Sequence, residues 1–255
     1  MNIILYMGVE ELDCLKFSKK LGFTLAEVLI TLGIIGVVAA MTIPTLIHEY
    51  KIRQYRTGYL RTSSLIQNAL KQTANEFGYD SYEDFFYICG NLPKSAASSC
   101  RSENAELFKQ INDDFLSRFK VMQTPSNTQF YQEKIKFKDY SGQYQTGYTE
   151  LYGITRWNTP YGGGHILIDG SLISSITFFY HEPSDGFSIT FDTNGPYKGP
   201  NQYGRDLFLF NVGYWNKLCS EKAGGSIFNG RGCYDYAKRD INPDDKNKGY
   251  WKSLK

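Results

Sequence analysis

The hydrophobic pattern divides the chain into one long helix and a later region of strands. Residues 28–47 contain no charged side chain, and a helix of about 20 such residues can cross the hydrocarbon core of a bilayer. Beyond Pro44 the pattern becomes amphipathic, because apolar side chains recur every three, four or seven residues and share one helical face: Ile52, Tyr55, Tyr59, Ile66, Leu70 and Phe77. We therefore predict a helix from Phe23 to Phe77 that ends at Gly78.

The region after this helix is expected to combine a loop, a second helix and a sheet. Residues 78–101, which contain glycine, proline and several serines, are predicted to form a loop. A helix is expected at 103–120, where apolar residues repeat every four positions: Leu107, Ile111, Phe115 and Phe119. The period then shifts towards two, which predicts strands near 135–137, 164–168, 171–180, 187–192 and 206–212. The fold class is therefore α+β, with an antiparallel sheet late in the chain that covers the long helix.

A short motif precedes the apolar run. Residues 19–28 are Lys-Lys-Leu-Gly-Phe-Thr-Leu-Ala-Glu-Val, and no small-residue cleavage site of a secretory signal follows the apolar stretch. The motif resembles the amino terminus of the type IV prepilins and type II secretion pseudopilins. In that family a dedicated prepilin peptidase cuts before the apolar stretch, on the cytoplasmic side, and methylates the new amino terminus.

The resemblance implies roles for four residues. Gly22 occupies the position before the cut, and Phe23 would become the N-methylated amino terminus. Glu27 would be the fifth residue of the mature chain, where the family carries its glutamate. A carboxylate in a bilayer is costly unless it finds a partner, so we expect Glu27 to pair with the amine of Phe23 on a neighbouring subunit. The alternative is that Glu27 lies at the level of the lipid headgroups, at the end of the transmembrane helix. Pro44 stands where many members kink the helix.

The resemblance also implies an organisation of the whole chain. Residues 1–22 would be a leader that is removed, residues 23–47 a transmembrane or filament-core helix, and residues 48–255 an extracytoplasmic pilin-like domain. The protein would cross the inner membrane once and enter a pilus or pseudopilus after assembly. Its expected partners are the prepilin peptidase, other pilin or pseudopilin subunits, an inner-membrane assembly platform and the lipid bilayer. Cleavage would leave 233 of the 255 residues, a size that favours a minor subunit.

Charge and cysteine content refine this interpretation. The net charge of +2 does not favour nucleic acid as a bulk partner. Cys14 falls in the leader, and the remaining four cysteines fit an oxidising compartment. We expect the local pairs Cys89 with Cys100 and Cys219 with Cys233, although four cysteines permit three pairings and buried free thiols are an alternative.

The segment between the last two predicted strands, residues 192–206, is a candidate calcium site. Asp192, Asn194 and Asp206 offer the hard oxygen ligands that calcium prefers, but the bidentate glutamate of an EF-hand is missing. The segment resembles the carboxyl-terminal calcium loop of major pseudopilins in role and placement, although not in spacing. The alternative is a turn in which the Asp and Asn side chains bond their own backbone.

Other chemistry has little support in the sequence, and we expect no enzyme. His48, His165 and His181 are scattered, without metal-ligand spacing, and no phosphate loop or G-x-S-x-G elbow appears. Lysines alternate with apolar residues at 134, 136 and 138. These lysines either face solvent on one side of a half-buried strand or contact the phosphates of a nucleic acid, whose bases would stack on nearby tyrosines. The tyrosines available for such stacking are Tyr140, Tyr144 and Tyr148.

These observations favour a structural subunit of a type II secretion pseudopilus or type IV pilus. A competence-type pseudopilin that captures DNA is one alternative. A membrane-anchored extracytoplasmic binding protein or enzyme is another.

Overall fold

The computed structural model describes residues 22–89, 94–125, 135–145, 163–179, 186–213, 218–223 and 229–254. They fall into two parts that meet between His48 and Glu49, and each part is described by itself. Helix α1, Leu25–Glu76, contributes to both parts and continues through Pro44. Its bounds lie within two residues of the predicted ones, so the prediction of the long helix is confirmed.

The first part consists of the amino-terminal half of α1 and the residues that lead into it. Its apolar side chains are exposed: Leu29, Ile30, Ile34, Ile35 and Met41 are each at least 60% exposed. The helix contains an 18-residue window with a mean hydropathy of 2.2. By length and composition it can therefore cross a membrane. A helix that is apolar on all sides needs lipid or other apolar helices around it.

The second part begins with the remainder of α1 and contains several short helices. They are the 3₁₀ helix η1 (Tyr82–Ile88), α2 (Lys94–Glu103), α3 (Ala105–Ser117), α5 (Cys233–Arg239) and the 3₁₀ helix η3 (Trp251–Ser253). Helix α3 confirms the predicted second helix over a shorter range. The predicted loop at 78–101 is wrong, because η1 and α2 lie there. Ser81 and Asp84 form a capping box that starts η1.

A six-stranded antiparallel sheet follows and confirms the predicted α+β fold. Its strands are β1 (Val121–Gln123), β4 (Gly164–Leu167), β5 (Leu172–Ser174), β6 (Thr177–Phe179), β7 (Gly186–Asp192) and β8 (Leu207–Gly213). The order is β1-β4-β5-β7-β6, and β8 pairs with β7 along its whole length. The single strand predicted at 171–180 is interrupted at Ser175 and Ile176, so that β5 and β6 pair separately with β7.

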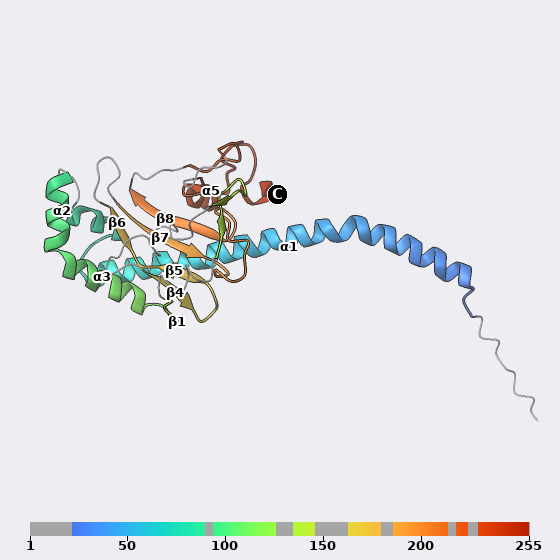
Figure 1. The fold of residues 1–255 in the computed structure, drawn as a ribbon, viewed down its shortest axis with the longest axis horizontal. Helices are drawn as coiled ribbons and strands as arrows, with labels where there is room; N and C mark the ends of the chain where they lie inside the picture. Colours follow the sequence, from blue (N-terminus) through green and yellow to red (C-terminus); the bar gives the residue numbers. More distant parts are fainter. Residues whose placement is uncertain are drawn as a thin grey trace, which may run out of the picture. The chain divides into compact units, whose positions relative to one another are not determined.

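The core lies between α1 and the sheet, whose strands run beside the helix in Figure 1. Tyr59 is 1% exposed, and its ring centroid lies 4.8 Å from that of Phe208 and 5.4 Å from that of Trp251. The remaining core residues include Ile66 and Leu70 of α1, Phe108 and Phe115 of α3, and Phe187, Ile189 and Phe191 of β7. This helical face is the one that the amphipathic spacing predicted.

A small hairpin covers a second hydrophobic cluster. Strands β2 (Phe137–Lys138) and β3 (Tyr144–Gln145) pair with each other. Phe137 is 2% exposed and packs with Leu172, Tyr203, Leu207 and other residues of this cluster. A bridge between Lys138 and Gln202 joins the hairpin to residues 192–206. This arrangement brings the candidate calcium segment against the body of the second part.

Gly58 allows the same segment to approach α1. A Cβ atom added at Gly58 would lie only 3.0 Å from the Cβ atom of Thr193, a distance tighter than most real contacts. Helix α1 is not broken at this glycine. The missing side chain therefore serves close packing between the helix and the segment that follows β7.

Candidate functional site

The candidate cleavage site lies directly before α1. Gly22, Phe23 and Thr24 have no helical structure, and the Phe23 side chain is 88% exposed. A Cβ atom added at Gly22 would meet no described atom within 4 Å. The backbone between Gly22 and Phe23 is thus non-helical and uncovered among the described residues. Residues 1–21 of the expected leader lie outside those residues.

Glu27 is joined to Thr24 by a reciprocal set of hydrogen bonds. The Glu27 Oε2 atom accepts from the Thr24 backbone N–H at 2.8 Å and from the Thr24 hydroxyl at 2.9 Å. The Glu27 N–H donates to Thr24 Oγ1 at 3.2 Å. This is a capping box, which satisfies backbone donors that the first turn of a helix leaves unpaired. The carboxylate therefore has partners within its own chain.

Thr24 is a residue that our sequence analysis missed. The signal was present, because a threonine followed three residues later by a glutamate and an apolar run is a sequence signature of a helix start. The sequence analysis considers Glu27 as a partner of the Phe23 amine on a neighbouring subunit or as an acid at the headgroup level, and not as part of a helix cap. The structure adds that Thr24 positions this carboxylate at the amino end of α1.

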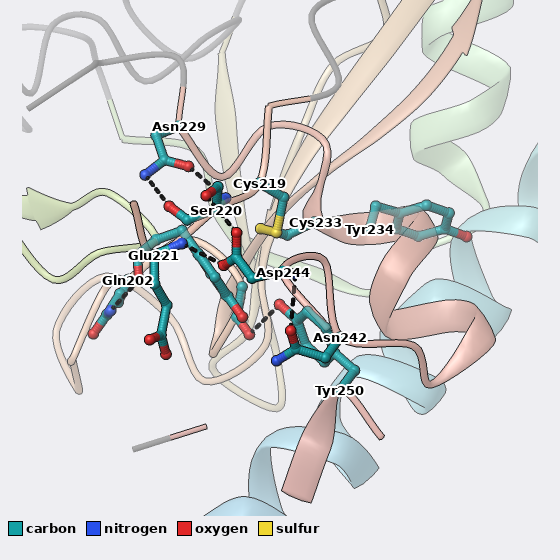
Figure 2. Close-up of a disulfide and its surroundings, with 12 residues drawn as sticks. Gln202, Cys219, Ser220, Glu221, Asn229, Cys233, Tyr234, Asn242, Asp244 and Tyr250 are labelled. Atoms are coloured by element: carbon teal, nitrogen blue, oxygen red, sulfur yellow. Dashed lines mark hydrogen bonds between the residues drawn. A yellow bond between two sulfur atoms is a disulfide. The ribbon is translucent and has the colours of Figure 1, made fainter. Parts of the chain in front are cut away.

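Two disulfides link the segments that surround the sheet. Cys89 at the end of η1 is bonded to Cys100 of α2, and Cys219 is bonded to Cys233 at the start of α5. These are the two local pairs that the sequence analysis favoured. Figure 2 shows the second disulfide beside a hydrogen-bond network. In it, Asp244 accepts from the Ser220 hydroxyl at 2.6 Å and from the Glu221 N–H at 2.7 Å.

The candidate calcium segment contains two buried carboxylates. Asp192 ends β7, and its Oδ1 atom accepts from the N–H groups of Asn194 and Gly195. Asp206 precedes β8, and its two oxygens accept from the N–H groups of Asn201 and Gln202. Burial raises the pKa of both carboxyl groups, and the charge of Asp206 raises that of Asp192 further. A cation between them would offset this unfavourable burial.

Two side-chain amide oxygens are further possible ligands for a cation in this segment. The Oδ1 atoms of Asn194 and Asn201 are buried and have no hydrogen-bond partner among the residues that the structure describes, an arrangement that is costly unless another group satisfies them. Asn201 has a φ of 50°, and its side-chain nitrogen donates to the Pro196 carbonyl. Among the described residues no three His, Cys, Asp or Glu side chains gather as a metal cluster. Any cation here would therefore need the amide oxygens as well as the carboxylates, and hard oxygens of this kind suit calcium.

The histidines do not form a site within the described residues. His165 of β4 lies between Thr124 and Ser175, whose hydroxyl oxygens are 3.0 Å from Nδ1 and 3.2 Å from Nε2. Burial lowers the pKa of His165. His48 is exposed on α1, and His181 lies outside the described residues.

The structure describes only some of the lysines and tyrosines that the sequence analysis considers as a surface for nucleic acid. Lys136 is exposed, and the Lys138 ammonium lies 4.7 Å from the ring centroid of Tyr144, which is 65% exposed. Tyr140 is buried and stacks on Tyr250 at 6.1 Å. Tyr140 therefore cannot stack on bases as the sequence analysis had considered. Lys134 and Tyr148 lie outside the described residues.

The architecture is that of a pilin-like protein: a long, apolar amino-terminal helix continues into an α+β part with an antiparallel sheet. A family model described as the prokaryotic N-terminal methylation motif matches residues 17–43, which include Gly22, Phe23 and Glu27. The chain thus carries the signature of the type IV prepilin and pseudopilin family. The motif implies processing by a prepilin peptidase and assembly with other pilin subunits. No curated protein and no solved structure matched the chain.

Proposed function

We propose that the protein is a structural subunit of a type II secretion pseudopilus or a type IV pilus. The observation that carries the proposal is the methylation motif at residues 17–43, directly before an apolar helix. In this proposal the peptidase cuts between Gly22 and Phe23 and methylates Phe23. An inner-membrane assembly platform then moves α1 from the bilayer into the core of a filament. Both environments are apolar, so the exposed side chains of α1 need not enter water.

The two disulfides support an orientation for the membrane-bound subunit. Disulfides persist in oxidising compartments and are rare in the cytosol. Both join cysteines that lie after the apolar run. We therefore place residues 48–255 in the periplasm or outside the cell, where they face neighbouring subunits or cargo.

Glu27 would exchange partners when the subunit assembles. In the isolated chain Thr24 supplies its carboxylate with two neutral donors. In the filament the methylated amine of Phe23 on a neighbour would offer a cation instead. Hydrogen bonds between charged groups are roughly twice as strong as neutral ones, and the low dielectric of a helix bundle strengthens them further. The exchange would favour the assembled state and set the register between neighbouring helices.

The amino terminus and mass of the protein, purified from native membranes, test the proposal first. We expect a chain that begins at N-methylated Phe23. A chain that retains its leader in cells with an active prepilin peptidase would refute processing, and with it the filament assignment.

Variants of Glu27 then test assembly. Glu27→Ala should be cleaved normally and fail to enter filaments. Glu27→Gln keeps the capping geometry without the charge, so it should also fail if the ion pair carries assembly. Glu49→Ala, on the same helix and exposed, is the matched control and should assemble like the wild type. Normal assembly of Glu27→Gln would show that only the cap is required.

We also propose that residues 192–206 bind calcium. Asp192 and Asp206 would supply the charged ligands. The amide oxygens of Asn194 and Asn201, which have no hydrogen-bond partner in the described part of the chain, would supply neutral ones. Because Thr193 packs on Gly58, the cation would also stabilise the contact between this segment and α1. The melting temperature of the protein, measured with calcium and with chelator, tests this role; no shift at millimolar calcium would refute it.

DNA capture is a second candidate function, which rests on Lys136, Lys138 and Tyr144 at the surface of the β2–β3 hairpin. If phosphates are bound there, the affinity for DNA must fall steeply as salt is added. Lys136→Ala and Lys138→Ala should weaken that binding, whereas Lys120→Ala, at an exposed lysine elsewhere, should not. An affinity that does not depend on salt would exclude phosphate contacts of this kind.

A further inference from the structure

The second part of the molecule carries opposite charge at the two ends of its α1 segment. Residues 72–93 contain four acidic side chains and no Lys or Arg: Glu76, Asp80, Glu83 and Asp84. We call this segment the acidic end. It covers the last turn of α1, the turn after it and η1. Helix α2 and the first turn of α3 leave its charge unchanged, because Lys94 and Arg101 are balanced by Glu103 and Glu106.

The basic end combines the start of this α1 segment with the carboxyl-terminal region. Residues 49–56 and 233–255 together contain nine Lys or Arg and five Asp or Glu side chains. Arg56 Nη2 lies 3.5 Å from Asp240 Oδ2, and Tyr59 donates to the Tyr234 carbonyl at 2.9 Å. These contacts show that the two segments lie together. The net charge of this basic end is +4 and that of the acidic end is −4.

The two ends are well separated along the helix. The side chains of Arg56 and Glu76 belong to one helix, and 20 residues at 1.5 Å per residue place their backbones roughly 30 Å apart. Figure 1 shows α2 beyond the carboxyl end of α1, whereas α5 lies farther back along the same helix. This distance exceeds the screening length of about 8 Å at physiological salt. Each end therefore presents its own charge to a neighbour.

Two acids at the basic end have local partners, and four of its lysines are exposed. Asp244 accepts from Ser220 and Glu221, and Asp245 lies 3.0 Å from the ammonium of Lys248. Lys51, Lys238, Lys246 and Lys252 are exposed. At the acidic end, Asp80 and Glu83 are exposed as well. Within the described residues neither of these two acids forms an ion pair with a basic side chain.

From this complementarity we infer that the basic end of one copy docks on the acidic end of the next copy of this chain. The contact is heterologous, because two different patches meet, and such contacts propagate into open filaments. Opposite ends attract and like ends repel, so the contact also fixes the polarity of the array. The inference rests on the proposed function as a filament subunit and identifies a surface that orders the subunits outside the membrane.

Charge reversal in the full chain, expressed with its native assembly machinery, tests this contact. The acidic-end variant is Asp80→Lys with Glu83→Lys, and the basic-end variant is Lys246→Glu with Lys252→Glu. Each should reduce copy-to-copy cross-linking in filaments at least about tenfold, while cleavage before Phe23 remains normal. The control Lys109→Glu with Lys120→Glu changes the charge by the same amount as the basic-end variant, at exposed sites outside both ends. Its cross-linking should match that of the wild type.

Combination of the variants provides the decisive result. Each double variant shifts the net charge of one end by four, from −4 or +4 to zero, and leaves the other end as in the wild type. The two double variants should therefore cross-link with each other when they are expressed together, because the basic end of one meets the acidic end of the other, although each alone is defective. Wild-type assembly by both double variants would refute the contact and leave the filament assignment intact. A defect in the basic-end variant alone, without rescue, would overturn the copy-to-copy contact in favour of anionic lipid headgroups. A wild-type chain that keeps its leader would instead reject the proposed function.

Discussion

Replacement of Asp192 by asparagine separates the charge of the candidate calcium segment from its turn geometry. Both hydrogen bonds to the Asp192 side chain, from Asn194 and Gly195, end on the same oxygen atom, Oδ1. The side-chain amide oxygen that Asp192→Asn introduces can accept both bonds. The variant therefore removes a buried charge and a charged ligand but leaves the turn in place.

The expected effect has opposite signs with and without calcium. Burial and the charge of Asp206 raise the pKa of Asp192, so this carboxyl group favours the folded state below the ordinary pKa of about 4. That contribution is lost as the pH rises through the folded-state pKa, at about 1.4 kcal/mol per unit of pKa difference. At pH 8 in chelator, Asp192→Asn should therefore melt at a higher temperature than the wild type.

In calcium the order should reverse. A ligand present at 100 times its dissociation constant stabilises the folded state by about 2.7 kcal/mol. In a domain of this size that free energy raises the melting temperature by roughly 5–11 °C. The wild type should show this shift, and Asp192→Asn should lose most of it because a neutral amide replaces a charged ligand.

The assay is thermal unfolding of the full chain in detergent, at pH 5 and pH 8, in chelator and in millimolar calcium. Asp169→Asn is the matched control, because the Asp169 Oδ1 atom likewise accepts two hydrogen bonds, both from Ser171. Burial acts to raise the pKa of Asp169, but the Ser171 hydrogen bonds and Arg61 together keep it below its ordinary value. This control should lower the melting temperature at pH 8 and keep the calcium shift. Equal calcium shifts in Asp192→Asn and the wild type would refute coordination by Asp192.

Three further predictions concern single contacts. Thr24→Ala removes the capping box that Thr24 forms with Glu27 and should destabilise the start of α1 by about 1 kcal/mol. The measurement is the yield of sheared filaments, which should fall in Thr24→Ala and recover in Thr24→Ser. Tyr59→Phe removes the hydrogen bond from the Tyr59 hydroxyl to the Tyr234 carbonyl and should cost about 0.5–1.5 kcal/mol, seen as a lower melting temperature at unchanged secondary structure. Burial lowers the pKa of His165, so the free energy of unfolding should rise with pH between the folded-state pKa and about 6.5. His165→Gln should flatten this pH dependence. An unchanged dependence would assign it to another group.

The long helix and the main strands could be predicted because their signals are local and periodic. The apolar spacing of Tyr59, Ile66 and Leu70 follows the face that is buried in the structure. The short helices have weaker local signals. Helix α5 has seven residues and no side-chain cap, and it begins at Cys233, which is covalently fixed to Cys219. Tertiary contacts determine such elements, and a single sequence does not display them.

The residues of the candidate sites also differ in how far the local sequence reveals them. Gly22, Phe23 and Glu27 lie within six consecutive residues, so their motif can be read directly from the chain. Asn201 was missed as a candidate ligand because its proposed role depends on a left-handed backbone with a φ of 50° and on burial that only the folded segment creates. Tyr140 was considered as a surface aromatic residue, but packing against Tyr250 buries it.

Under the proposed function, the carboxyl-terminal disulfide would help the α5 region to remain attached to the α1 segment of the second part when force is applied to the helix. Tyr234 contacts three residues on successive turns of α1: its carbonyl accepts from Tyr59, and its hydroxyl is bonded to Ser63 and Gln67. Cys233, the preceding residue, is bonded to Cys219. Extraction of a subunit from a membrane would pull on α1, and this force must pass to the fold through side-chain contacts of this kind. A disulfide limits how far the chain around Tyr234 can separate from Cys219 when those contacts open. Re-formation of the contacts is therefore favoured over complete unfolding.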